Sequence, residues 1–504
     1  MWRIEGTATA ADDPPDLVER LEVVRTRTDF FAPGRPVVVA RAPGRLDLMG
    51  GIADYSGSLV LQLPLAVATY VAAQADDEPL LTVASEGAAT AGDEPVVAVP
   101  LEALVPGTAV AAEVTGRHLA DYRALHETLT AEPRRRWVAY VAGALAVLRG
   151  ERSRSGEPYL RRPGPAHGAR LLVHSTVPMG KGVSSSAALE VAAMRALCAL
   201  YGVELAPREL ALLCQKVENA VAGAPCGVMD QMTAACGTRD RLLALRCQPA
   251  ELEEAVTLPP EVEVWGIDSG IRHAVSGADY TSVRVGAFIG YRIVADLAGL
   301  PAGRGPDGRV RIEDPRWQGY LANVSPAEWA SRYEHAVPET LDGETFLRRY
   351  GGLTDPVTAV EPGRTYAVRA PTAHPIFEHH RVRLYRALLQ GGSPDDERLS
   401  LLGELMYQSH ASYSACGLGS DGTDRLVELV QRAGPAVGLF GAKITGGGCG
   451  GTVAVLARRG ARPQVEAIRA RYEAETGRRS LILAGSSSGA DRFGVRTLVP
   501  VHGA

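Results

Sequence analysis

The sequence predicts a mixed α+β fold in two domains. Its 504 residues exceed the length of one ordinary domain. Short apolar runs typical of strands occur among longer segments whose apolar residues recur at helical spacing. Hydrophobic residues make up 46% of the chain and charged residues 22%, as in ordinary globular proteins, so we do not expect overall disorder.

Three strands are predicted in the first half of the chain. They cover residues 37–42, 58–65 and 169–177, and the first is expected to end at Pro43 and Gly44, because this dipeptide is typical of a turn. Both early strands suit the edge of a sheet that presents a loop.

Two helices follow the third strand. The alanine-rich segment 186–201 predicts a helix that stops at Gly202. Apolar residues at helical spacing predict a second helix over residues 207–221, which places Glu218 in the last turn before Gly223.

Residues 299–364 differ in composition from their surroundings. This segment is rich in proline, glycine and charge, but it also contains Trp317, Tyr320 and Trp329. Aromatic residues of this size usually pack, so the segment is predicted to be a folded insertion rather than a linker. Its end, residues 351–363, resembles a loop.

Helical patterns resume near residue 380, and a helix over residues 463–476 lies between strand-like segments 452–457 and 480–483. Gly446, Gly448 and Gly451 match the letters of the dinucleotide fingerprint G-x-G-x-x-G. They lead into a strand, whereas the fingerprint needs a strand before it and a helix after it. We therefore do not expect a dinucleotide-binding fold.

Charge and composition exclude several partners. The net charge of −5 gives no indication of nucleic acid or anionic lipid as a partner. The first fifteen residues lack the apolar core of a signal peptide, and no apolar run reaches the length of a membrane span. A cytoplasmic protein without nucleic-acid or membrane partners is the expectation, and the oligomeric state stays open.

Cysteine and histidine give no metal or redox motif. The seven cysteines are widely spaced without a C-x-x-C pair, so we expect reduced thiols. His374, His379 and His380 cluster in the sequence, but no cysteine or helical carboxylate partner accompanies them.

The segment from Gly180 to Ser186 has the composition of a phosphate cradle. Gly180 and Gly182 precede Ser184, Ser185 and Ser186, where a strand turns into the alanine-rich helix. A helix start offers unpaired N–H groups and the positive end of the helix dipole, and glycines let a phosphate approach the main chain. Taken alone, such a segment is more often only a tight turn with a serine N-cap. Lys181 is not followed by Ser or Thr, so a P-loop NTPase is not expected.

Three glycine-bearing segments, residues 43–50, 178–188 and 443–451, resemble in order and spacing the three motifs of the GHMP small-molecule kinases. The likeness extends to galactokinases through residues 225–232, which resemble their catalytic loop, and through Arg272-His273 and Asp279-Tyr280, which resemble their sugar side. It is greater still to the kinase part of plant-type L-arabinokinases, which the chain resembles through the insertion and residues 417–424.

This resemblance implies a fold and a division of the chain. The N-terminal domain, resembling ribosomal S5 domain 2, would cover residues 1–248, and the ferredoxin-like C-terminal domain would cover residues 249–504 with its insertion at about 299–364. The active site would lie in the cleft between them, with ATP and a small-molecule sugar as substrates and Mg²⁺ as cofactor.

The resemblance also implies catalytic roles. Asp230 would accept the proton of the sugar hydroxyl, beside Arg45, whose charge would favour the carboxylate and stabilise the attacking oxygen and the γ-phosphate. Whether Asp230 abstracts the proton or only positions the hydroxyl stays open. Ser186 and Glu218 would hold magnesium, although Glu218 alone could be a solvated helix carboxylate.

The predicted contacts to ATP and to the sugar form two sets. ATP phosphates are expected at Gly180, Lys181, Gly182, Val183, Ser184, Ser185, Ser186 and Ala187. For Lys181, a role as a solvent-facing turn residue is an open alternative. The sugar is expected at Arg45, Gly51, Ile52, Asp54, Tyr55, Gly227, Asp230, Tyr280, Gly446 and Gly447.

One departure from the galactokinase pattern predicts the sugar. Galactokinases carry Glu-His, which helps to hold the hydroxymethyl end of galactose, where this chain has Gly51 and Ile52. L-arabinopyranose has the ring stereochemistry of D-galactose without the sixth carbon, so phosphorylation of L-arabinose at its anomeric hydroxyl is expected. Alternatives are a galactokinase, a galacturonokinase-type enzyme and a catalytically silent sugar sensor. Ile52 could also pack into the sheet while another loop contacts the sugar.

Overall fold

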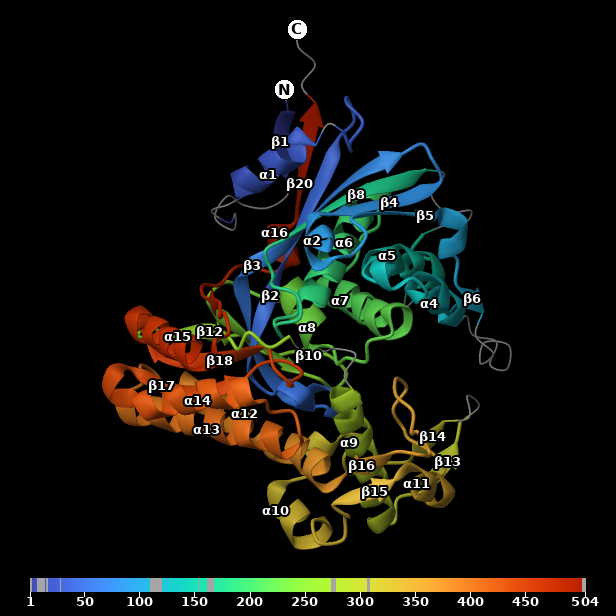
Figure 1. Ribbon diagram of the computed structural model, residues 1–504. Coiled ribbons are helices and arrows are strands. Elements are labelled where there is room, and N and C mark those ends of the chain that lie inside the picture. The colour runs from blue at the N-terminus through green and yellow to red at the C-terminus, as the bar shows by residue number, and fades with distance from the viewer. Residues whose placement is uncertain are drawn as a thin grey trace.

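The computed structural model has the predicted α+β architecture, with a ten-stranded sheet and a separate four-stranded sheet (Figure 1). It describes residues 2–6, 14, 17–27, 29–108, 120–153, 155–160, 167–272, 278–305 and 309–500. Three two-stranded sheets complete the strands of these ranges.

The large sheet has the order β1-β20-β2-β3-β8-β4-β5, and β9 joins it beside β3 and pairs with β10 and β11. Its strands are β1 (Trp2–Gly6), β2 (Val37–Met49), β3 (Leu59–Asp76), β4 (Leu80–Ser85), β5 (Val96–Pro100), β8 (Gly168–Ser175), β9 (Arg241–Arg246), β10 (Glu251–Leu252), β11 (Val256–Thr257) and β20 (Val495–Pro500). Only β4 and β8 pair in parallel.

The predicted end of the first strand at Pro43 and Gly44 is wrong, because β2 continues to Met49. The pairing of β2 with β3 shifts register between Pro43 and Arg45 and again between Asp47 and Met49. Such irregularities accommodate a proline, which cannot donate to the ladder. The continued strand carries Arg45, which is buried.

Helices α4 to α8 lie together on one face of the large sheet (Figure 1). They are α4 (Arg123–Thr130), α5 (Val138–Gly150), α6 (Ser185–Tyr201), α7 (Pro207–Lys216), the π-helical turn η5 (Val217–Ala222) and α8 (Met229–Cys236). The small residues of α6 let it pack closely against its neighbours. The helices predicted over residues 186–201 and 207–221 are both confirmed. The last turn of the second is π-helical, and it holds Glu218 before Gly223 as expected.

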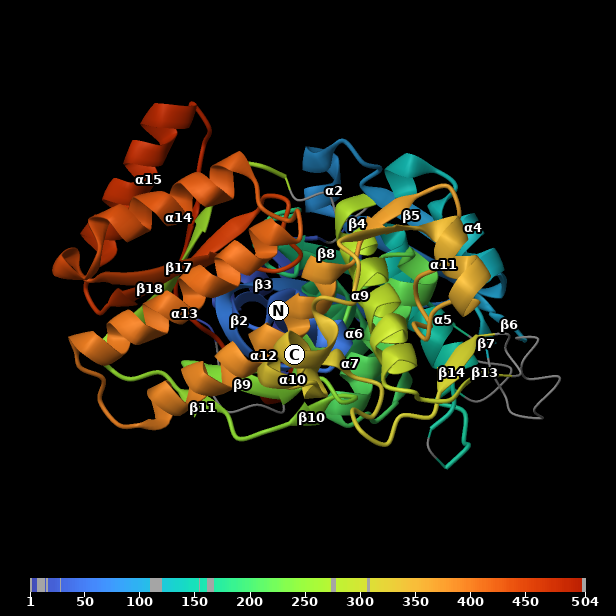
Figure 2. The same ribbon diagram turned by 90° about the horizontal axis from the view of Figure 1, so that it is seen from below.

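The second sheet has the antiparallel order β17-β18-β12-β19. Its strands are β12 (Val262–Asp268), β17 (Leu439–Ile444), β18 (Thr452–Arg458) and β19 (Ile482–Leu483). The helices beside it are α13 (Asp396–Ala415), α14 (Asp421–Ala433) and α15 (Arg462–Thr476). Seen from below, this unit and helices α4 and α5 lie on opposite sides, with α9 (Ala278–Leu297) and α12 (Arg369–Gln390) between them (Figure 2).

The last strand returns to the first sheet. β20 pairs with β1 and β2, although the predicted division at residue 248 assigns it to the second domain. The short helix α16 (Ala490–Phe493) precedes this strand. The two domains are therefore connected by a second crossing of the chain, and the exact division stays a prediction.

The described part of residues 299–364 is folded against α9 and α12, as the aromatic content predicts. Its elements are β13 (Ala302–Arg304), β14 (Val310–Ile312), η6 (Leu321–Asn323), α10 (Pro326–Glu328), η7 (Trp329–Tyr333), β15 (Thr340–Asp342) and α11 (Gly343–Tyr350). Trp317 and Trp329 are buried in a cluster that includes residues of both helices. Residues 351–364 form an irregular loop before β16 (Thr365–Ala367).

The remaining elements are α1 (Leu17–Thr26), η2 (Gly51–Ser56), α2 (Glu86–Ala91), η3 (Leu101–Leu104), β6 (Gly107–Thr108), β7 (Ala120–Asp121), η4 (Pro133–Arg135) and η8 (Pro435–Val437). The seven cysteines are free thiols. Among the described helices, none combines the length and the apolar character that a bilayer crossing requires. His374 hydrogen-bonds to Ser412, and Leu59 donates its N–H to His379, so both histidines have structural partners.

Candidate active site

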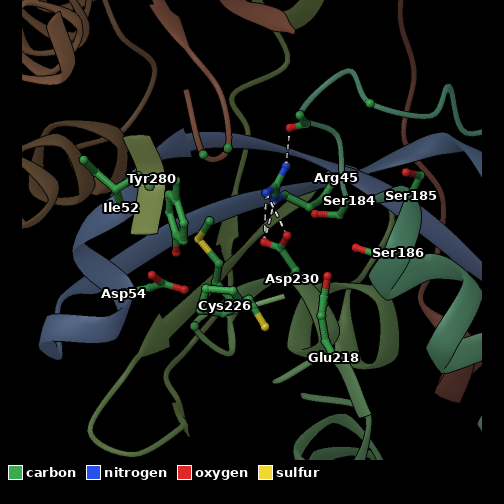
Figure 3. Close-up of a pocket in the computed structure, with 18 residues that line it drawn as sticks. Arg45, Ile52, Asp54, Ser184, Ser185, Ser186, Glu218, Cys226, Asp230 and Tyr280 are labelled. Carbon is green, nitrogen blue, oxygen red and sulfur yellow. Dashed lines mark hydrogen bonds and ion pairs between the residues drawn. The ribbon is translucent and has the colours of Figure 1, made fainter. Parts of the chain in front are cut away.

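Most of the predicted site residues line one pocket, between the start of α6, the start of α8 and the loop before β18 (Figure 3). Its lining consists of Arg45, Gly51, Ile52, Asp54, Gly180, Gly182, Ser184, Ser185, Ser186, Glu218, Pro225, Cys226, Gly227, Met229, Asp230, Tyr280, Gly446 and Gly447. Both sheets contribute, since Arg45 is on β2 while Gly446 and Gly447 follow β17.

Arg45 connects the catalytic loop to the glycine-serine turn. Its Nε donates to Asp230 Oδ1 and its Nη2 to Asp230 Oδ2, each over 3.0 Å, while its Nη1 donates to the carbonyl oxygen of Gly182 over 2.7 Å. The Arg45 side chain is 3% exposed and that of Asp230 is 21% exposed, so the carboxylate is the member of the pair that solvent or substrate can reach. Asp230 lies in the first turn of α8 rather than on a loop.

The turn before α6 has an unused hydrogen-bonding group. Ser184, at the N-cap of α6, adopts a left-handed conformation with φ of 60°, and its buried Oγ has no hydrogen-bond partner in the protein. Ser185 and Ser186 are the first two residues of the helix and also face the pocket. An orphaned hydroxyl beside a helix N-terminus fits a bound anion such as phosphate.

The third glycine segment closes against this turn. Gly446 has φ of 73°, and a Cβ atom placed there would lie 2.6 Å from the carbonyl oxygen of Gly182 and 3.3 Å from Nη2 of Arg45. No side chain fits at this position. The absence of a Cβ lets the segments from the two sheets meet at Arg45.

Two buried carboxylates lie beside Ser186. Gln231 Nε2 donates to Oε2 of Glu218 over 2.5 Å and to Oε2 of Glu190 over 3.2 Å. Burial raises the pKa of Glu218 to about 7, which a hydrogen bond from Ser186 partly offsets, and burial with the charge of Glu218 raises the pKa of Glu190 well above its usual value. A positive charge beside Glu218 and Glu190 would favour the ionised form of these two carboxyl groups.

This donor set fits magnesium. Carboxylate and hydroxyl oxygens from Glu218 and Ser186 are hard ligands, and Mg²⁺ in kinases takes its other ligands from phosphates and water. The described residues contain no group of three or more His, Cys, Asp or Glu arranged to hold a metal.

Asp54 lies on the opposite side of the pocket, in η2. It is 4% exposed, and a Cβ on Gly227 would lie 1.7 Å from its Oδ2, so the glycine lets the catalytic loop close onto this carboxyl. Burial, and secondarily the charge of Asp230, raises the pKa of Asp54 to about 7, although Arg284 acts in the opposite direction.

We expect Asp54 to make stability depend on pH. The pKa of Asp54 is about 3.9 in the unfolded chain and about 7 in the folded protein. The free energy of unfolding therefore falls as the pH rises from about 3.9 to about 7, because the unfolded chain ionises first, and it stays at the lower value above that pH. Asp54→Asn removes this pH dependence. Its unfolding free energy relative to the unsubstituted protein should therefore rise by about 2 kcal/mol between pH 5.5 and pH 8.5. Thermal unfolding without ligands measures this, and a difference independent of pH would contradict it.

The corner at Gly51 and Ile52 is closed by a residue that the sequence did not indicate. Tyr413 Oη accepts the N–H of Ile52 over 2.9 Å and donates to the carbonyl oxygen of Gly446 over 3.1 Å. A Cβ on Gly51 would lie 1.4 Å from this oxygen. Ile52 lines the pocket and also packs in a buried cluster with Tyr413 and Ile444, so its wall of the pocket is apolar.

Four predicted residues lie outside the pocket lining. Lys181 binds Asp268 at the end of β12, with 2.9 Å between Nζ and Oδ2, so it is not a free, solvent-facing turn residue, and its contact with ATP stays a prediction. Val183 and Ala187 are buried core residues. The ring of Tyr55 packs against Tyr280 at 6.1 Å between centroids, and only Tyr280 faces the pocket.

The lining also contains residues that the prediction of sites left out. Pro225, Cys226 and Met229 line the pocket, and all three belong to the segment that resembles a catalytic loop, which was the available signal. On the predicted sugar side, Arg272 is exposed, while His273 and the side chain of Asp279 lie outside the described residues.

Three family models match parts of the chain. The GHMP kinases N terminal domain matches residues 139–238, the galactokinase galactose-binding signature matches residues 28–75, and the GHMP kinases C terminal model matches residues 385–474. The matched ranges contain Ser184 to Ser186, Arg45 and helix α14.

Similar proteins and structures include sugar kinases. The chain is 44% identical over 494 residues to the L-arabinokinase of Arabidopsis thaliana, which covers 91% of this chain and 46% of that protein, so the chain spans about half the length of this relative. It is 29% identical over 449 residues to the galactokinase of Chloroflexus aurantiacus, covering 88% of this chain and 90% of that protein.

The fold is similar to the crystal structure of Lactococcus lactis galactokinase complexed with galactose, with a TM-score of 0.68 at 20% identity, covering 94% of this chain and 99% of that one. The two domain models, the galactose-binding signature and the 44% identical relative lead to one assignment. The chain contains both the N-terminal and the C-terminal domain of GHMP kinases.

Proposed function

We propose that this protein is an ATP-dependent sugar 1-kinase that transfers the γ-phosphoryl group of ATP to the anomeric hydroxyl of L-arabinose. The arrangement of Asp230, Arg45 and the glycine-serine turn carries the proposal. A single guanidinium binds both carboxylate oxygens of Asp230 and the carbonyl oxygen of Gly182, so an acceptor hydroxyl at Asp230 would face phosphates at the start of α6.

In this mechanism Asp230 accepts a hydrogen bond from the sugar hydroxyl and aims its oxygen at the phosphate. Proton removal and positioning by Asp230 are both compatible with phosphoryl transfer, which depends mainly on alignment and charge neutralisation. Arg45 stabilises the negative charge that develops on the attacking oxygen and the transferred group. The hydroxyl of Ser184 and the N–H groups at the start of α6 bind phosphate oxygens.

Ser186 and Glu218 are the residues that would hold Mg²⁺, which neutralises charge on the nucleotide phosphates when bound. Gln231 holds the Glu218 carboxylate toward the pocket by its 2.5 Å hydrogen bond. Its position between two carboxylates also limits their mutual repulsion.

The proposed preference for L-arabinose depends on the wall formed by Ile52. Gly51 carries no side chain because Tyr413 occupies the space, and Ile52 offers no polar partner to a hydroxymethyl group. A buried hydroxyl without a partner costs about 1–3 kcal/mol, which corresponds to a preference of about 10- to 100-fold rather than exclusion. The identity to the L-arabinokinase of Arabidopsis thaliana supports this assignment.

A panel of sugars tests the proposal. Sugar-dependent ADP release is measured with L-arabinose, D-galactose and D-galacturonate, and the phosphorylated carbon is identified by NMR. The expected result is the highest kcat/KM with L-arabinose and phosphate on its anomeric oxygen. Higher kcat/KM with galactose or galacturonate would refute the substrate, and sugar binding without ADP release would indicate a sensor instead.

The variant Ile52→Ala tests the wall. Removing the side chain opens space beside Gly51, so the ratio of kcat/KM for galactose to that for arabinose should rise about tenfold. Ile444→Ala is the matched control, because Ile444 belongs to the same buried cluster without lining the pocket. An equal change of the ratio in both variants would contradict the role of Ile52.

A further inference from the structure

A buried ion pair joins the loop of the predicted insertion to Arg284, which contacts the catalytic loop. Asp355, in the loop after α11, accepts from Arg284 of α9 through both oxygens, over 2.7 Å from Nε and 2.8 Å from Nη2. The side chains are 5% exposed for Arg284 and 0% for Asp355. Val357 N–H and the Thr358 hydroxyl also donate to Asp355, so the carboxylate is held firmly within its loop.

The third nitrogen of Arg284 contacts the catalytic loop. Its Nη1 donates to the carbonyl oxygen of Cys226 over 3.0 Å. From the other side, Asn219 Oδ1 accepts the N–H of Cys226 over 2.7 Å. The peptide groups of Cys226 are thus held between α9 and the π-helical turn that carries Glu218, and both Cys226 and the next residue, Gly227, line the pocket.

Aromatic rings fix the plane of this guanidinium. Arg284 lies over the ring of Tyr55 at 5.3 Å and over the ring of Phe288 at 5.8 Å. Tyr55 in turn packs edge-on against Tyr280, which lines the pocket. Movement of Arg284 would therefore disturb both the catalytic loop and a wall of the proposed sugar site.

We propose that the segment 299–364 is part of the active site, because its Asp355 holds Arg284 as a positioning residue for the sugar side of the catalytic loop. This inference rests on the proposed function, but the contacts from which it is argued do not depend on which sugar is bound. Arg284 also places a positive charge near Asp54, which faces Asp230 and Asp47 as its other charged neighbours. The segment thus supports binding of the acceptor rather than of the nucleotide.

Kinetics of four variants test the proposal. Arg284→Met removes the charge and all three hydrogen bonds, and kcat/KM for the sugar should fall about 100-fold, mainly through KM, while KM for ATP stays within about twofold. Arg284→Lys retains the positive charge but not the two N–H donors that bind both oxygens of Asp355, so it should recover only part of the lost kcat/KM. Asp355→Asn should weaken sugar binding in the same direction. Arg292→Met, also a buried arginine of α9 but with no contact to the pocket, is the control.

A double variant separates positioning from stability. Arg284→Met with Asp355→Leu replaces the ion pair by apolar side chains, which often restores the stability lost when one charge is left buried alone. We expect its thermal midpoint to return toward that of the unsubstituted protein while its KM for the sugar stays raised. Recovery of both would overturn the proposal, since the pair would then act through stability alone.

Hydrogen exchange makes the test independent of activity. Amides of residues 226–230 should exchange faster in Arg284→Met and in the double variant, and at the unsubstituted rate in Arg292→Met. If the unsubstituted protein phosphorylates no sugar, the proposed function fails, whereas the positioning role is still tested by this exchange. Unchanged exchange in Arg284→Met would overturn the role of Arg284.

Discussion

Replacing Asp230 by Asn is expected to lower kcat with L-arabinose by about 10²–10⁴-fold. The change keeps the shape of the side chain but removes the negative charge that binds Nε and Nη2 of Arg45. In the proposed mechanism, the same carboxylate accepts the proton of the acceptor hydroxyl or orients it. ADP release at saturating ATP and sugar measures the effect. Nucleotide binding should persist, because the proposed phosphate contacts come from the turn before α6.

The control for Asp230→Asn is its thermal midpoint and its affinity for ATP. Both should stay close to those of the unsubstituted protein, since the Asp230 side chain is partly exposed and Asn keeps its size and one oxygen that can accept from Arg45. Turnover that falls by less than about tenfold would contradict the assigned role.

Arg45→Lys is expected to lower kcat by about 10³-fold although it retains the positive charge. Lysine cannot bind two carboxylate oxygens and the Gly182 carbonyl oxygen at the same time, so Asp230 and the glycine-serine turn lose their connection. The same ADP assay measures the loss. An accompanying rise in KM for both substrates is expected, because Arg45 lies between the two binding regions.

Arg41→Lys is the matched control for Arg45→Lys. Arg41 is on the same strand, equally buried at 2% exposed, and its guanidinium donates to the Ser488 carbonyl oxygen and to Ser487 Oγ, away from the pocket. This variant should lose stability but keep kcat in the molecules that remain folded. Equal losses of kcat in the two variants would show that Arg45 acts only through the fold.

The sequence predicted the elements that carry the site but misjudged some of their ends. The start of α6 and the place of Glu218 followed from glycine, serine and helical spacing, which are local signals. The continuation of β2 through Pro43 could not be predicted, because a bulged pairing with β3 overrides the local preference of Pro-Gly for a turn. Likewise, the return of β20 to the first sheet is a pairing across most of the chain.

Site prediction had a similar limit. Glycine-rich segments and the segment with Asp230 could be recognised by residue type and spacing, and the structure brings most of them into one pocket. Lys181 was ambiguous because its partner Asp268 lies in another sheet. Tyr413 and Arg284 gave no signal, because an isolated tyrosine or arginine in a helix acquires a role only from the backbone groups that the fold places beside it.

By itself, the sequence determined the glycine-serine turn and helix start at which we propose that phosphate binds, because the N–H groups of a helix start and the φ values open to glycine are properties of a few adjacent residues. It also determined that Gly51 and Ile52 offer no polar side chain where galactokinases carry Glu-His. Only the tertiary structure decided that Asp230 shares Arg45 with the Gly182 carbonyl oxygen, that Tyr413 fills the space beside Gly51, and that Asp355 binds Arg284, which donates to the catalytic loop. These contacts join residues tens to hundreds of positions apart, and their geometry depends on how the two sheets and the helices pack.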